Sequence, residues 1–172
     1  MTGASPANPE RYDPARHDPS AFACGNDVLD RWLKQSASQS QRRDAARTFV
    51  LTDGDAVVGY CALLAGELEL AEATERTRKG MSRHYPIPVA VLARLAVDRG
   101  HQTRGLGAVL LRDALRRVTL AAEHLAIRAV VVHAIDDGAT RFYEHYGFRA
   151  LSATPRTLMV TLAELRAAGY PR

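Results

Sequence analysis

The sequence predicts an α/β fold, and three observations in its second half carry that prediction. An apolar run over 89–98 is followed by a glycine-containing loop and then by a long helical pattern. A second, short apolar run follows at 129–134, and another helical segment comes after it. A strand, a crossover helix and a second strand favour parallel pairing of 89–98 with 129–134 inside a sheet covered by helices.

Length and composition indicate a soluble globular protein. The chain has 172 residues, of which 47% are hydrophobic and 24% charged, so it can bury a core without a metal or disulfide. Its two cysteines, Cys24 and Cys61, form no metal-binding pair, and we expect no metal. No apolar run is long enough to cross a membrane, and the first twenty residues do not resemble a signal peptide. We therefore expect a cytoplasmic protein with a flexible tail over 1–10 and a single domain over 11–172.

The first half predicts a helix and a hairpin. Asn26 or Asp27 is a suitable N-cap for a helix that runs toward Ser40. The expected apolar face of this helix consists of Val28, Leu29, Trp32 and Leu33. Two strands are predicted at 47–52 and 56–64, joined by the turn Asp53-Gly54-Asp55. Residues 67–85 are expected to form a helix or an extended loop that Pro86 and Pro88 close.

The second half predicts strands and helices in alternation. After the strand at 89–98 and a loop over 99–107, one helical stripe holds Leu110, Leu111, Ala114, Leu115, Val118, Ala121, Ala122 and Leu125. The run at 129–134 is continuous, as expected for a strand covered on both faces. Asp136 or Asp137 can cap a short helix that continues through His145 and ends at Gly147. A last strand at 158–162 and a helical turn at 163–168 complete the chain.

The loop between strand and long helix has the pattern of an anion site. Gln102, Gly105 and Gly107 form a Q-x-x-G-x-G motif, in which glycines allow a tight turn and close approach of a ligand. The free amides at the start of the helix would then face a phosphate group. A plain turn is the alternative. The motif is neither a dinucleotide-binding fingerprint nor a P-loop, so dinucleotide binding is disfavoured. The combination of a strand, this loop and a long helix favours a pyrophosphate site over a plain turn.

Two motifs resemble the GNAT superfamily of acetyl-CoA-dependent N-acetyltransferases. One is the loop from Gln102 to Gly107 after the strand at 92–97, and the other runs from Ala139 through Phe142 and Tyr143 to Gly147-Phe148. The resemblance covers about 22–162. It implies a mixed central sheet with splayed parallel central strands flanked by helices, and acetyl-CoA as the acetyl donor.

The same resemblance implies the residues of the site. The donor-binding set would be Leu95, Ala96, Val97, Gln102, Thr103, Arg104, Gly105, Leu106, Gly107, Ala108, Ala139 and Phe142. Tyr143 would be the general acid that protonates the leaving thiolate, and its phenol pKa, ordinarily near ~10, exceeds the thiol value of ~8.5. The alternative for Tyr143 is a packing aromatic residue. No pattern indicates a covalent acyl-enzyme, and Cys24 and Cys61 are interpreted as buried small residues.

A narrower resemblance points to one branch of the family. The segments Phe22-x-Cys24-Gly25, Arg47-Thr48-x-Val50 and Pro86-Ile87-Pro88-Val89 are similar to those of GNAT toxins from bacterial toxin–antitoxin pairs. That branch acetylates the α-amino group of aminoacyl-tRNA, which blocks translation, and pairs with ribbon-helix-helix antitoxins. It also implies a homodimer. The alternatives are an acetyltransferase of small amines or protein N-termini, and a non-catalytic GNAT-fold module in a repressor complex.

Charge along the chain is unevenly distributed. Residues 31–47 hold five basic groups and one acid, 48–75 hold six acids and no Lys or Arg, and 76–99 hold six basic groups and one acid. Ordinary solvated faces would explain these blocks, but a polyanionic partner would also suit them. On the resemblance, the candidate tRNA-binding residues are Arg42, Arg43, Arg47, Arg76, Arg78, Lys79, Arg83 and Arg94. Acids that could meet an antitoxin are Glu67, Glu69 and Glu72. His101 and His133 are possible proton carriers, with structural roles as the alternative.

Overall fold

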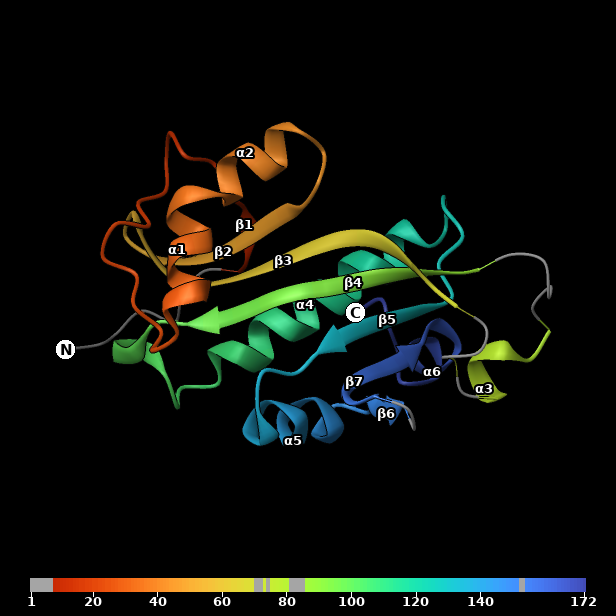
Figure 1. The fold of residues 1–172 in the computed structure, drawn as a ribbon. Coiled ribbons are helices and arrows are strands. Elements are labelled where there is room, and N and C mark those ends of the chain that lie inside the picture. Colours follow the sequence, from red (N-terminus) through yellow and green to blue (C-terminus); the bar gives the residue numbers. More distant parts are fainter. Residues whose placement is uncertain (1–7, 70–72, 74, 81–85, 152–153) are drawn as a thin grey trace. The chain divides into compact units, whose positions relative to one another are not determined.

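The computed structural model describes residues 8–69, 73, 75–80, 86–151 and 154–172 (Figure 1). The chain forms two compact units, the first containing the described residues up to Leu64 together with Arg94–Ala114. The second contains the described residues of Ala65–Ala93 and Leu115–Arg172. The expected single domain over 11–172 stays a prediction, and most of the expected tail, 1–7, lies outside the described residues.

Helices and strands are interspersed along the chain. The strands are β1 (Glu10–Arg11), β2 (Arg47–Asp53), β3 (Ala56–Leu68), β4 (Ile87–Val97), β5 (Ala129–His133), β6 (Arg149–Leu151) and β7 (Thr154–Thr161). The helices are α1 (Asp27–Gln35), α2 (Ala37–Arg42), α3 (Glu75–Arg78), α4 (Leu106–Ala121), α5 (Asp137–His145) and α6 (Leu162–Ala167), and a short 3-10 turn, η1 (Arg99–His101), precedes α4. The α/β prediction is confirmed.

The strands form a mixed sheet in the order β1-β2-β3-β4-β5-β7-β6. The predicted hairpin is confirmed, because β2 and β3 pair antiparallel on either side of Gly54. The predicted parallel pair is also confirmed, with Val89 opposite Ala129 and Leu92 opposite Val132. β7 then pairs antiparallel with both β5 and β6. β5 lies between β4 and β7 in the sheet, and its first four residues are buried, as expected for a strand covered on both faces.

In the first unit, helices pack against both faces of β3. The Tyr60 side chain is fully buried in a cluster with Leu29 and Leu33 of α1. Gly59, the preceding residue, points to the other face, where an added Cβ would lie 3.1 Å from Leu110 of α4. A glycine at this point lets α4 approach the sheet closely, so the loop before α4 has a fixed base.

The N-terminal helical segment differs from its prediction at two points. Asn26 is the N-cap, accepting from the amides of Val28 and Leu29, but the helix breaks at Ser36 and resumes as α2. The prediction that Val28 lies on the buried apolar face is wrong, because its side chain is 63% exposed. The expected positions Leu29 and Leu33 are confirmed as buried, and Ala37 of α2 is buried as well. Their spacing of four residues defines the face on the sheet, and Val28 lies outside it.

The apolar stripe predicted for α4 extends to Leu125, beyond the end of the observed helix. The helix ends at Ala121, which is exposed, and Leu125 is 63% exposed. After Ala121 the chain turns toward β5, and the Arg128 amide donates to the Pro88 carbonyl at 2.8 Å. The apolar spacing continues past the point where this turn ends the helix.

Three further boundaries differ from the prediction. Pro88 lies inside β4 rather than before it, at a strand start where a missing N–H is tolerated. Of the segment 67–85, the described residues contain the end of β3 and the short helix α3. The strand β6 was not predicted, and β7 begins before the expected 158.

No helix in the described part of the chain is long and apolar enough to span a membrane.

Candidate functional site

The loop between β4 and α4 is anchored by the side chain of Gln102. Its amide nitrogen donates to the carbonyl of Val97 at 2.9 Å and to that of Cys24 at 3.0 Å. The Thr103 hydroxyl donates to the Gln102 carbonyl at 2.6 Å. Gln102 therefore joins the end of β4, the segment before α1 and the loop, and its amide nitrogen is occupied by these contacts.

Asp98 holds the other end of the same loop. Its carboxylate accepts from the amides of Ala23 and Gly100, both at 3.0 Å, and lies 3.2 Å from Nδ1 of His101. Burial opposes ionisation of Asp98, but these hydrogen bonds outweigh it and hold the pKa of Asp98 below its ordinary value. At neutral pH Asp98 is therefore a carboxylate that fixes the loop. His101 is a possible proton carrier, with a structural role as the alternative. Its contact with the Asp98 carboxylate fits the structural role.

The loop backbone takes an unusual course just before α4. Thr103 has a φ of 65° and Gly105 a φ of 78°, both in the left-handed region. A threonine in that region is strained, and such strain is typical of ligand-binding loops. A Cβ added at Gly105 would meet nothing within 4 Å, so the space beside the backbone is open.

The start of α4 adds the electrostatics of a phosphate site. The first amides of an α-helix lack partners within the helix, and the dipole places partial positive charge there. The first turn of α4 contains no acidic residue to occupy these amides. An exposed, glycine-containing loop leading into such a turn fits a pyrophosphate group.

The other residues expected to bind the donor fall into two groups. In the first unit, Gln102, Thr103, Arg104 and Gly105 are exposed, Gly107, Leu95 and Val97 are half-buried, and Leu106 and Ala108 are buried. Ala96 packs into the core beside α1, so only its backbone is available to a ligand. Ala139 and Phe142 are half-buried on α5 of the second unit. Their binding roles stay predictions.

The aromatic residues of α5 form a packed cluster in the second unit. Tyr143 is 7% exposed, with Phe142 and Phe148 edge-on at ring distances of 5.3 and 5.5 Å. Asp136 caps the helix by accepting from the Ala139 amide at 2.7 Å. The cap and the ring contacts fix the orientation of Tyr143. In the same unit, Nδ1 of His133 lies 3.0 Å from the Thr157 hydroxyl.

Neither cysteine has the surroundings of a nucleophile. Burial, followed by the hydrogen bond with Asp30, raises the pKa of Cys24 to about 11. Cys61 is fully buried. A thiol in an apolar environment stays protonated at neutral pH and is inert.

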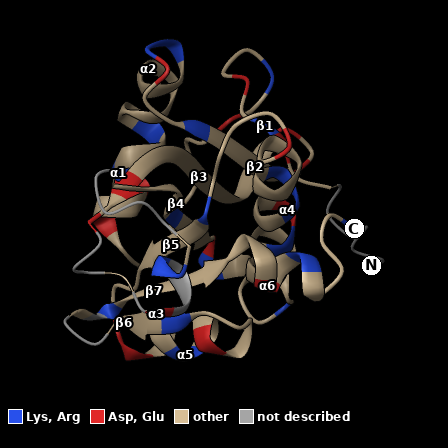
Figure 2. Ribbon diagram, turned by 90° about the vertical axis from the view of Figure 1, so that its right-hand side faces the viewer, with Lys and Arg blue, Asp and Glu red and all other residues tan. Residues whose placement is uncertain are grey.

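The predicted tRNA-binding residues differ in how freely they can meet a partner. Arg42 and Arg43 are exposed on and just after α2, and Arg78 and Lys79 are exposed at the end of α3. Basic residues colour part of the α2 ribbon blue in Figure 2. Arg47 is bound locally by the Asp44 carboxylate and the Gln41 carbonyl. Arg83, the side chain of Arg76, and Glu72 lie outside the described residues. Glu67 and Glu69 are exposed.

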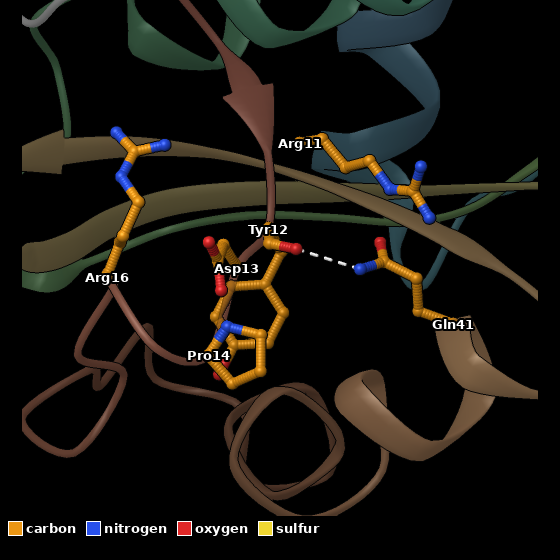
Figure 3. A pocket seen from close by; sticks show the side chains of 6 residues that line it. All are labelled: Arg11, Tyr12, Asp13, Pro14, Arg16 and Gln41. Atoms are coloured by element: carbon orange, nitrogen blue, oxygen red, sulfur yellow. Dashed lines mark hydrogen bonds between the residues drawn. The ribbon is translucent and has the colours of Figure 1, made fainter.

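A pocket of about 400 Å³ lies outside the predicted site, in the first unit (Figure 3). It is lined by Arg11, Tyr12, Asp13, Pro14, Arg16 and Gln41. Gln41 donates to the Tyr12 carbonyl at 2.8 Å, and Arg16 lies 3.2 Å from the Glu10 carboxylate. The Gln41 contact therefore joins α2 to the segment that follows β1, and no sequence motif marks the pocket.

Comparison with known proteins identifies relatives over most of the chain. Residues 44–150 match the acetyltransferase (GNAT) domain model. The chain is 40% identical over 150 residues to the tRNA-acetylating toxin of Mycobacterium tuberculosis (strain ATCC 25618 / H37Rv), covering 87% of this chain and 89% of that protein.

Solved structures with the same fold include three of the toxin AtaT. AtaT complexed with acetyl-methionyl-tRNAfMet has a TM-score of 0.85 and 27% identity, covering 94% of this chain and 98% of that one. AtaTR bound with AcCoA has a TM-score of 0.81 and 27% identity, covering 94% of this chain and 96% of that one. A mutant of AtaT bound to the C-terminus of the antitoxin AtaR has a TM-score of 0.81 and 25% identity, covering 94% of this chain and 97% of that one.

Proposed function

The chain belongs to the GNAT acetyltransferase family, and we propose that it transfers the acetyl group of acetyl-CoA to the α-amino group of aminoacyl-tRNA, which blocks translation. The observation that carries this proposal is the 40% identity with a tRNA-acetylating toxin across 87% of the chain. The AtaT complex supports the same substrate class, because an acetylated aminoacyl-tRNA is the product that such a transfer yields.

The loop before α4 would hold the pyrophosphate of acetyl-CoA. The open space at Gly105 and the free amides at the start of α4 support this assignment. The backbone of Leu95, Ala96 and Val97 would hold the pantetheine arm and polarise the thioester carbonyl through an N–H. The remaining donor contacts assigned to the chain are those of Gln102, Thr103, Arg104, Leu106, Gly107, Ala108, Ala139 and Phe142.

Tyr143 would complete the transfer by supplying one proton. The neutral amine of the aminoacyl ester attacks the carbonyl carbon, a C–N bond forms, and the C–S bond of the thioester breaks. The phenol of Tyr143 donates its proton to the leaving sulfur, and the proton lost by the amine passes to water. The substrate ammonium has a pKa near ~8, so a sufficient neutral fraction exists without a strong protein base.

The basic residues would meet the tRNA backbone, which proteins recognise mainly through phosphates and shape. These residues are Arg42, Arg43, Arg47, Arg76, Arg78, Lys79, Arg83 and Arg94. A tRNA substrate and two cysteines that are not joined in a disulfide both fit a cytoplasmic location. We also assign the chain a homodimeric state and an antitoxin of the ribbon-helix-helix class. A precedent for pairing with an antitoxin is the structure of AtaT bound to the C-terminus of AtaR.

A pulse of expression followed by mass analysis of cellular tRNA tests the proposal. We expect N-acetylated aminoacyl groups on one or more charged tRNAs, together with arrested translation. If charged tRNAs stay unmodified while small amines or protein N-termini become acetylated, the substrate assignment is wrong. If growth arrest occurs with no acetylated product at all, the chain acts as a binding module.

A further inference from the structure

Arg94 belongs to a stack of three side chains in the first unit. Trp32 of α1 lies nearly parallel to Tyr60 of β3, with an interplanar angle of 11° and a ring distance of 5.9 Å. The guanidinium carbon of Arg94 lies 4.6 Å from the centre of the Trp32 ring. The Tyr60 hydroxyl donates to the Leu29 carbonyl at 2.7 Å, and Tyr60 is fully buried. The aromatic base on which Arg94 lies is therefore held rigidly.

The guanidinium of Arg94 lacks an anionic partner among the residues that the structure describes. Its Nε is buried and makes no hydrogen bond, and no described carboxylate forms an ion pair with it. The face of Trp32 stabilises a cation, but it cannot accept the in-plane N–H groups. A buried charged donor without an acceptor costs free energy, and such a group in a folded protein is typical of a ligand site.

The position of Arg94 indicates which substrate its ligand belongs to. Arg94 and Ala96 are two residues apart in β4, so their side chains point to the same face of the sheet. Ala96 packs in the cluster that contains α1. Arg94 directly precedes the backbone segment Leu95–Val97 that would hold the thioester end of acetyl-CoA, so the two lie within about 10 Å. The phosphates of acetyl-CoA all lie at the adenosine end, beyond the uncharged pantetheine arm, and the pyrophosphate is assigned to the loop beyond the end of β4. An anion beside the thioester end therefore belongs to the acetyl acceptor.

We propose that Arg94, held on Trp32, binds a phosphodiester group at the acceptor end of aminoacyl-tRNA. This inference rests on the proposed function. The carboxyl group of the amino acid is esterified in that substrate, so the anions nearest its amine are phosphodiesters. A planar guanidinium offers paired donors that match phosphate oxygens. Arg94 thereby positions the amine, and it takes no part in the transfer itself.

The test compares two acceptors in the Arg94→Met variant. Methionine keeps an apolar contact with Trp32 but removes the charge. With bulk charged tRNA we expect KM to rise about tenfold, as for loss of a charge-assisted hydrogen bond, with kcat little changed. With an aminoacyl ester of adenosine, which has no phosphate, we expect the same KM as for the wild type. Arg166→Met, which removes an exposed arginine on α6, is the matched control and should change neither value.

Other outcomes separate this inference from the proposed function. An unchanged KM for charged tRNA, or an equal rise for both acceptors, overturns the role of Arg94 while wild-type activity on tRNA upholds the proposed function. Absence of wild-type activity on charged tRNA overturns both. If Arg94→Met does not fold, Arg94→Lys serves in its place, because it keeps the charge but loses the planar stack. A rise in KM confined to tRNA again supports the proposal, and a rise with both acceptors, or with neither, contradicts it.

Discussion

At the scale of single residues, Tyr143 is the group on which the proposed chemistry depends. We expect Tyr143→Phe to lower kcat by about 10²–10⁴-fold, the usual contribution of a general acid. The fold should persist, because the phenylalanine ring keeps the edge-on contacts with Phe142 and Phe148. Steady-state kinetics with charged tRNA, beside circular dichroism, provides the measurement.

A neighbouring tyrosine supplies the control for that variant. Tyr146 follows α5 and also lies against Phe142, with a ring distance of 5.2 Å. Tyr146→Phe should therefore retain wild-type kcat. Equal losses from the two substitutions would mean that the phenol of Tyr143 has no special role.

Cys24 is expected to be chemically silent. Because burial raises its pKa to about 11, the thiol stays protonated at pH 7–9, and alkylation by iodoacetamide should be slow there and accelerate only as the pH approaches about 11. Since the folded state disfavours the thiolate, Cys24 contributes stability that is present below the ordinary thiol pKa and is lost as the pH rises toward 11. Cys24→Ala should retain acetylation. Complete loss of activity in that variant, with the fold intact, would revive a covalent mechanism.

At the scale of elements, the loop before α4 depends on Gln102. Gln102→Ala removes the two hydrogen bonds to Val97 and Cys24. We expect KM for acetyl-CoA to rise by up to about thirtyfold, since each bond contributes about 1 kcal/mol. The KM for tRNA should change little. Gln39→Ala, at an exposed position of α2, is the matched control. A Gln102→Ala enzyme with wild-type KM for acetyl-CoA would contradict the anchoring role.

The N-cap of α5 gives a prediction about stability. Asp136→Ala removes the acceptor of the Ala139 amide and should lower the free energy of unfolding by about 1 kcal/mol. The corresponding fall in Tm is about 2–4 °C for a chain of this size. Asp136→Ser, which can still cap, should restore most of the loss in a urea melt. Equal stability of the alanine and serine variants would show that the cap contributes nothing.

Element positions were predictable where local chemistry decides them. The caps at Asn26 and Asp136, the turn at Gly54 and the parallel pair at Val89 all follow from short segments. The break at Ser36 and the end of α4 do not, because tertiary contacts decide where each helix stops. The short strand β6 carries no periodic signal of its own and forms by pairing with β7.

At the scale of the whole molecule, the basic residues predict salt-dependent binding of tRNA. Replacing Arg42 and Arg43 together by Gln should raise KM for charged tRNA and reduce the slope of log KM against log salt by about one to two. Activity on a small aminoacyl ester should not change. Arg166→Gln, which removes one exposed charge from α6, is the control. An unaltered slope in the double variant would remove this patch from the tRNA surface.

Only part of the candidate site was predictable from the sequence, namely the part formed by residues that are close together in the chain. Gln102, Gly105 and Gly107 form one contiguous motif, so the loop was visible in the sequence. The stack of Trp32, Tyr60 and Arg94 was not, because it joins three distant elements and leaves no spacing pattern. Likewise, the anchoring contact of Gln102 with Cys24 joins residues far apart in the chain.

The central claim is that the chain acetylates the α-amine of aminoacyl-tRNA. Its most direct measurement is incubation of the purified protein with labelled acetyl-CoA and bulk charged tRNA, followed by recovery of the tRNA and release of its amino acids. We expect label on the α-nitrogen of the released amino acids, and loss of that label when Tyr143→Phe replaces the wild type. Label transferred to small amines or protein N-termini while the charged tRNA stays unlabelled would contradict the claim.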